Sequence, residues 1–180
     1  MTVTFITWNI HKAQYLSKYL WYSVNHQKID LDELQSLDLQ EIVDHKLDQA
    51  YKIIKQPVLV EDVSLEFTEL GRLPWTFIKQ FMQELSFQQI CDLVPWEKRW
   101  ATARCVFWYY DWIEKYFFEW SLNGSIAHTP QWDNGFGRDP IFIPDWYQCT
   151  RAQLNEEDDK KTYLKIKPFE KVKKFLESRR

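Results

Sequence analysis

The chain has 180 residues, of which 45% are hydrophobic, and a formal net charge of −3 at pH 7. This composition is typical of a globular protein, and the length favours one domain spanning residues 1–180. The negative charge gives no electrostatic reason to expect a nucleic-acid polymer as partner, although one basic pocket is enough to hold a mononucleotide.

Other features of the composition bear on the compartment and on surface contacts. No apolar run is long enough to span a bilayer, so we expect no membrane partner. The three widely spaced cysteines fit neither a disulfide framework nor a zinc site, and the N-terminus lacks a signal-peptide pattern, which together predict a cytoplasmic protein. Ten Trp, nine Tyr and twelve Phe exceed what the core requires, so several are expected at the surface.

The first half of the chain alternates between predicted strands and helices. β-Branched and aromatic runs predict strands, and apolar residues at helical spacing predict helices. The expected order is a strand at Val3–Thr7, a helix at Lys12–Tyr22, a strand at Lys28–Leu31 and a helix at Leu39–Ile54. A buried strand at Val58–Val60 then ends at Glu61 and Asp62, followed by a short helix at Leu65–Leu70, a turn at Gly71–Pro74 and a helix at Trp75–Leu85.

The second half predicts mostly strands and closes with a helix. Residues 101–122 are rich in β-forming side chains and are expected to form a hairpin that turns near Tyr110–Lys115. The remaining expected elements are a strand at Ser125–Ala127, a loop at Asp133–Gly137, a strand at Ile141–Ile143, a charged exposed segment at Glu156–Lys161 and a helix at Phe169–Leu176.

Three segments place reactive groups at the ends of predicted strands, where sites in α/β proteins commonly lie. Thr7, Asn9 and Lys12 lie on a loop before a helix, whose N-terminus favours a phosphate, although a capped helix with a surface lysine explains the same residues. Asp62 follows a buried strand and is suited to hold Mg²⁺ or to orient a water, with an exposed acidic turn as the alternative. Because Glu61 and Asp62 are adjacent, their side chains are expected on opposite sides of the strand.

The third segment is the glycine-flanked loop Gly135–Pro140. Phe136 is expected to stand out from this loop and to stack on a purine base, with Asp139 beside it as a hydrogen-bonding acid. The alternative is a hairpin loop that buries Phe136 in the core.

These segments and three others, in this order, resemble the inosine triphosphate pyrophosphatase family. Thr7-Trp8-Asn9-Ile10-His11-Lys12 is similar to that family's Thr-Gly-Asn-x-x-Lys. The other matching blocks are Asp30–Glu33, Glu41–Ala50, Pro57–Asp62, Leu73–Lys79 and, as the longest, Asn134–Pro144.

The resemblance implies an α/β fold with a long, twisted, mixed β-sheet flanked by helices, in two lobes with a nucleotide cleft between them. It implies that water attacks the α–β phosphoanhydride of a nucleoside triphosphate, releasing the monophosphate and pyrophosphate, and that the protein is a homodimer. Glu33 and Asp62 would hold Mg²⁺ or position the water, with Lys12 as a further catalytic group. The implied substrate-binding residues are Thr7, Asn9, Lys12, Lys79, Phe136, Arg138, Asp139 and Lys160.

The sequence departs from the family where the base is recognised. The family's Lys-Asn-x-x-Ser-His-Arg falls on Asp159–Lys165, which lacks the serine, histidine and arginine, and Lys160 is the substitute lysine. Arg138 stands where the family has an aromatic residue, and Trp8 and Trp75 replace glycines. Since groups assigned to phosphate and metal largely survive, we expect a Mg²⁺-dependent pyrophosphatase for noncanonical purine triphosphates with altered base recognition. The alternative is a catalytically silent relative that binds a nucleotide or a protein.

Overall fold

The computed structural model describes residues 3–7, 9–20, 24–32, 34–132 and 136–179. Their strands are β1 (Val3–Ile6), β2 (Val24–Gln27), β3 (Val58–Phe67), β4 (Pro74–Trp75), β5 (Trp100–Tyr110), β6 (Lys115–Ile126) and β7 (Phe142–Pro144). Their helices are α1 (Ile10–Leu20), α2 (Leu39–Ile54), α3 (Ile78–Glu84), α4 (Phe87–Asp92), α5 (Glu156–Ile166) and α6 (Phe169–Ser178), with 3-10 turns η1 (Thr68–Leu70) and η2 (Arg151–Gln153).

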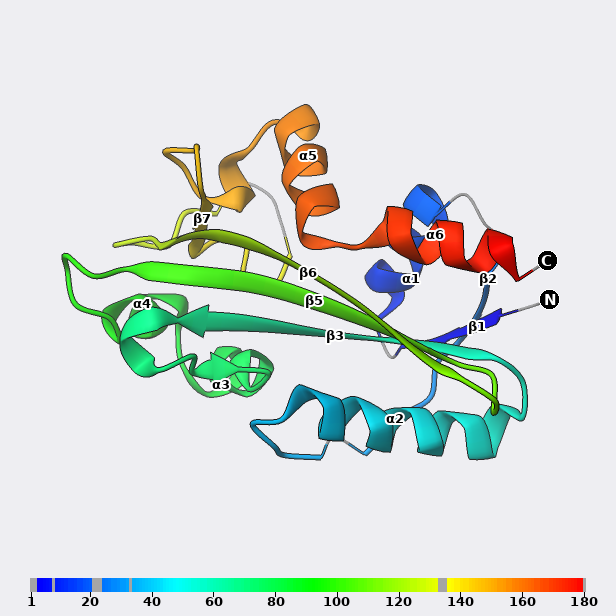
Figure 1. The fold of residues 1–180 in the computed structure, drawn as a ribbon. Helices are drawn as coiled ribbons and strands as arrows, with labels where there is room; N and C mark the ends of the chain where they lie inside the picture. Colours follow the sequence, from blue (N-terminus) through cyan, green and yellow to red (C-terminus); the bar gives the residue numbers. More distant parts are fainter. Residues whose placement is uncertain (1–2, 8, 21–23, 33, 133–135, 180) are drawn as a thin grey trace. The chain divides into compact units, whose positions relative to one another are not determined.

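In the described part of the chain, seven strands form one mixed sheet in the order β2-β1-β3-β5-β6-β7, with β4 paired to β3 (Figure 1). β1 pairs in parallel with β2 and β3, whereas β4 and β7 pair antiparallel with β3 and β6. The predicted α/β fold class, a mixed sheet flanked by helices, is therefore confirmed. None of the helices in these residues combines the length and apolar character needed to cross a bilayer.

The chain divides into two compact units, which take segments from across the sequence. The first unit comprises residues 1–62, 106–119 and 168–180, and the second comprises residues 63–105 and 120–167. Strands β3, β5 and β6 each contribute residues to both units. The prediction of one domain over residues 1–180 stays a prediction.

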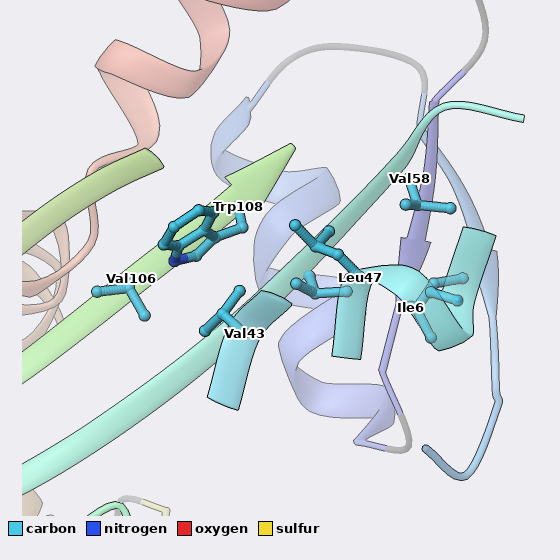
Figure 2. Packing of buried hydrophobic residues seen from close by; sticks show 8 residues of the cluster. Ile6, Val43, Leu47, Val58, Val106 and Trp108 are labelled. Atoms are coloured by element: carbon cyan, nitrogen blue, oxygen red, sulfur yellow. The ribbon is translucent and has the colours of Figure 1, made fainter. Parts of the chain in front are cut away.

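The first unit has helices on both faces of its part of the sheet, with α1 and α6 on one face and α2 on the other (Figure 1). α2 buries Val43, Leu47 and Ala50 at helical spacing against β1 and β3. Figure 2 shows Val43 and Leu47 packed with Val58 of β3 and Trp108 of β5. Burial of this apolar stripe fixes α2 against the strand that carries the candidate catalytic acid.

In the second unit, the half-buried Arg99 makes several hydrogen bonds to backbone carbonyls. The guanidinium of Arg99 donates to the carbonyl oxygens of Cys91, Val94, Ile126 and Ala127 at 2.6–3.1 Å, which joins α4 to the end of β6. Gly124 of β6 permits the pairing with β7, because a Cβ there would lie 2.2 Å from the backbone oxygen of Ile143.

Several predicted boundaries are wrong. The second strand is Val24–Gln27, so Lys28–Leu31 is not a strand. β3 does not end at Asp62 but continues to Phe67, because Leu65 and Glu66 pair with Trp75 and Pro74 of β4, and this replaces the helix predicted at Leu65–Leu70. Ser125–Ala127 is not a separate strand, since β6 itself runs to Ile126, and the helix predicted from Trp75 begins at Ile78.

Candidate active site

The loop after β1 carries three of the predicted substrate-binding residues, all in the first unit. The Asn9 side chain accepts hydrogen bonds from the backbone N–H groups of His11 (3.0 Å) and Lys12 (3.4 Å), and the Thr7 hydroxyl accepts one from the Asn9 N–H (3.1 Å). Asn9 therefore caps α1, which is the role of asparagine at a helix start. The cap brings Lys12, on the first turn of α1, towards β3.

Lys12 is not a surface lysine, because it pairs with a buried carboxylate. Its Nζ lies 3.3 Å from Oε1 of Glu61 on β3, and the Glu61 side chain is only 1% exposed. A charge buried to this degree requires a partner, and Lys12 supplies it. The structure thus brings Lys12 to Glu61, the acid next to Asp62 in the sequence.

Asp62 faces the opposite side of β3 and contacts α2. Lys46 of α2 donates a hydrogen bond to Oδ2 of Asp62 at 3.2 Å, and the two side chains are 12% and 14% exposed. This confirms that the adjacent acids project to opposite sides, as alternation along a strand requires. Lys46 was missed from the sequence, although it lies three residues after Val43 and four before Ala50, on the buried stripe of α2.

The second predicted metal ligand, Glu33, lies outside the described residues. Within the described residues, no group of three or more acids, histidines or cysteines is arranged to hold a metal ion. Asp62 alone nevertheless fits a Mg²⁺ site of the kind that uses one or two carboxylates and completes its coordination with substrate phosphates and waters.

The predicted base-binding loop lies in the second unit. The Phe136 ring is 49% exposed, so the alternative of a ring buried in the core is wrong. Oδ2 of Asp139 accepts a hydrogen bond from the backbone N–H of Phe136 at 2.9 Å. Asp139 thus closes the turn from which Phe136 projects, while residues 133–135 of the predicted loop lie outside the described residues.

Asp139 also contacts Arg151, a buried arginine that was not selected from the sequence. Arg151 of η2 donates from Nη1 to Oδ1 of Asp139 (3.1 Å), from Nη2 to Oδ1 of Asp159 (2.5 Å) and from Nε to the Thr162 hydroxyl (3.1 Å). The Arg151 side chain is only 6% exposed. The segment Asp159–Lys165, on which the family's Lys-Asn-x-x-Ser-His-Arg falls, therefore contacts Arg151 through Asp159 and Thr162.

Helix α5, which presents these two residues, is fixed at its start by its own sequence. Asn155 caps the helix by accepting a hydrogen bond from the N–H of Asp158 (2.9 Å). Hydrogen bonding from the Asn155 side chain lowers the pKa of Asp158, with a smaller contribution from Tyr147. Four acids in the first turn, Glu156–Asp159, favour a helix start at this place because they lie at its positive end.

The remaining predicted residues are also in the second unit. Lys79 lies exposed on the first turn of α3, Arg138 is half-buried in the turn after Phe136, and Lys160 is exposed on α5. Their predicted roles in substrate binding stay predictions.

Comparison with known proteins gives a consistent result. A sequence model described as the Ham1 family matches residues 3–175. The inosine triphosphate pyrophosphatase of Scheffersomyces stipitis is 32% identical over 193 residues, which cover 98% of both chains, and that of Yarrowia lipolytica is 32% identical over 182 residues, which cover 98% of this chain and 96% of its own. A solved structure of a HAM1 protein from Coxiella burnetii shares the fold, with a TM-score of 0.85 over 99% of each chain and 20% identity.

Proposed function

The chain belongs to the Ham1 family, and from this premise we propose that it is a nucleoside triphosphate pyrophosphatase acting on noncanonical purine triphosphates. The products are the nucleoside monophosphate and pyrophosphate. The observation that carries the proposal is the pair of adjacent acids on β3, Glu61 and Asp62, each held by a lysine from a different helix. These pairs lie on opposite sides of β3, and together they supply a carboxylate suited to orient a water and an ammonium group suited to bind a polyphosphate.

In the proposed reaction, the oxygen of a water forms a bond to the α-phosphorus and the bond to the β-phosphate oxygen breaks. Asp62 orients this water by accepting one of its hydrogens, and Lys46 holds Asp62 in place. Lys12, with the loop of Thr7 and Asn9, binds phosphate oxygens at the start of α1. Pyrophosphate leaves with the electron pair of the broken bond.

We propose Mg²⁺ as the cofactor. Asp62 would hold it together with Glu33, and the ion would offset the negative charge of the phosphates and polarise the bond that breaks. The oxygen-only donor set of these two carboxylates supports this choice, because Mg²⁺ prefers oxygen ligands and retains several waters.

The base is proposed to stack on Phe136, whose ring is half exposed. Since the family's Ser-His-Arg is missing, base recognition is proposed to be altered. We further propose a cytoplasmic homodimer. Highly exposed tryptophans support an interface of some kind, since Trp146 is 91% exposed and Trp96 is 74% exposed.

The test is pyrophosphate release from a panel containing ITP, dITP, XTP and the standard triphosphates, with and without Mg²⁺. We expect release that requires Mg²⁺ and that includes the noncanonical purines, and the ranking of the bases shows how recognition is altered. The Asp44→Asn variant is a matched control for Asp62→Asn, because Asp44 is an α2 acid that pairs with Lys115 instead. A folded protein that releases no pyrophosphate from any nucleotide would refute the proposal and favour the silent, nucleotide- or protein-binding alternative.

A further inference from the structure

We propose that Arg151 is a positioning residue for base recognition: it fixes Asp139 as a brace of the Phe136 turn, so that the base is recognised through the face of its ring and little through its edge. This inference rests on the proposed function, since it assigns a role in selectivity to residues of that site.

The contacts of Arg151 form a closed network within the second unit. Its three donors reach Asp139, Asp159 and Thr162, and its guanidinium carbon lies 5.6 Å from the ring centre of Tyr163. Thr162 is 1% exposed, and it donates in turn to the carbonyl of Asp159 at 2.9 Å. Arginine suits this place because its planar fork bonds several acceptors in fixed directions, which lysine does not reproduce.

The contact with Arg151 limits the hydrogen bonds that Asp139 can make to a ligand. One oxygen of Asp139 accepts from Arg151 and the other accepts from the Phe136 N–H, and the side chain is only 13% exposed. Both oxygens are therefore engaged with protein donors. Asp139 in this arrangement holds the turn, and its capacity to read the hydrogen-bonding edge of a base is reduced.

The segment Asp159–Lys165 likewise offers few side chains for reading the hydrogen-bonding edge of a base. Of the residues that replace the family's base-reading motif, Asp159 and Thr162 contact Arg151, whereas Lys160, Lys161 and Lys165 are exposed. The exposed ring of Phe136 is then the main recognition element. Stacking tolerates different exocyclic groups because every base presents a π face. We expect similar KM values for ITP, XTP, GTP and ATP in the wild type.

The experiment compares Arg151→Met and Arg151→Lys with the wild type, with Arg99→Lys as the matched control. Arg99 also makes several hydrogen bonds within the second unit, but it donates to backbone carbonyls of α4 and of the end of β6. We expect Arg151→Met to raise KM for all four purine triphosphates by about tenfold with kcat within about twofold, since a loosened turn weakens stacking. Arg151→Lys should recover part of the loss, and Arg99→Lys should leave the KM values unchanged.

A second readout does not depend on activity. Hydrogen exchange of the Phe136 amide, followed by NMR without nucleotide, should be faster in Arg151→Met than in the wild type. If the wild type releases no pyrophosphate but this exchange is faster, the proposed function fails while the bracing role stands. The inference is overturned if the exchange is unchanged, if kcat falls at constant KM, or if wild-type KM values differ by more than about 100-fold among the purines. If Arg151→Met does not fold, Asp159→Asn replaces it with the same expectations.

Discussion

Two regions of the molecule neutralise carboxylates in different ways. In the first unit, Lys12 and Lys46 each reach one oxygen of one acid, at 3.3 and 3.2 Å. In the second unit, Arg151 makes three bonds at once and binds two acids. A lysine ammonium is a point charge on a flexible stem, and it can change partners with little loss of geometry, whereas an arginine fork is fixed by its planar shape. We therefore expect the lysine–acid pairs of the first unit to exchange partners readily, and the Arg151 network of the second unit to keep its geometry.

The largest effect is expected from Asp62→Asn. Amide oxygen and nitrogen replace the carboxylate that is proposed to orient water and to hold Mg²⁺, so pyrophosphate release should fall by about 1,000-fold. The measurement is steady-state release with ITP and Mg²⁺. Asp44→Asn should stay near the wild-type rate, and a rate of Asp62→Asn within about tenfold of the wild type would remove Asp62 from the mechanism.

The next effect is expected from Lys46→Met, which leaves Asp62 without its lysine. We expect kcat to fall by about 100-fold, because the acid loses the contact that orients it. Lys115→Met is the matched control, since Lys115 pairs with Asp44 and Asp48 in the same unit. Equal losses of kcat in both variants would show that Lys46 acts through the stability of the fold, and would contradict its assigned role in orienting Asp62.

A smaller effect is expected on stability from Arg151→Met. Two acids lose their shared partner, and the free energy of unfolding should drop by about 2 kcal/mol, below the roughly 3–5 kcal/mol of fully buried pairs. The smaller loss of stability is expected because the side chain of Asp159 is 36% exposed, and solvent weakens its interaction with Arg151. Urea denaturation measures the change. A loss no greater than that of Lys46→Met would contradict the view that the second region is the fixed one.

The smallest effect concerns Cys91, whose backbone carbonyl accepts from Arg99. Burial raises the pKa of the Cys91 thiol to about 11, so that the thiol stays protonated at neutral pH. The folded-state pKa lies above the reference value of 9.0, so this contribution to stability is present below pH 9 and is lost as the pH rises through 11. Since the thiolate is the nucleophile, iodoacetamide at pH 8 should modify half-buried Cys149 before Cys91. Modification of Cys91 at an equal rate would show that the second unit opens more readily than its arginine networks suggest.

The fold was largely predictable where apolar patterns are long and regular. Leu39–Ile54 is helical as predicted, because its buried stripe repeats over the whole helix. β2 was misplaced because Asn25, His26 and Gln27 are polar, and the parallel pairing with β1 makes them a strand without an apolar pattern of their own. β3 was cut short because the acids at 61 and 62 interrupt an apolar run that then resumes with Leu65 and Phe67.

The sequence predicted those candidate site residues that lie on one strand, β3, or on the loop after β1 and the helix start that follows it. Lys12 and Asp62 were both selected, but the sequence did not indicate that their partners are Glu61 and Lys46, since these contacts depend on which face each helix covers. Arg151 was missed because its partners lie 12 and 8 residues away and no local spacing marks them. A buried arginine is visible only after packing is known.

The lysine pairs on β3 have a consequence for how substrate enters. Before nucleotide arrives, Lys12 and Lys46 already have acidic counter-ions, so this part of the molecule presents little uncompensated positive charge. Under the proposed function, phosphate oxygens would take the place of Glu61 at Lys12, so that binding would exchange one counter-ion of Lys12 for another while Lys46 keeps its contact with Asp62. Because Lys12 would lose Glu61 as it gains phosphate, the net electrostatic attraction would be small, and the affinity for substrate should therefore depend only weakly on ionic strength.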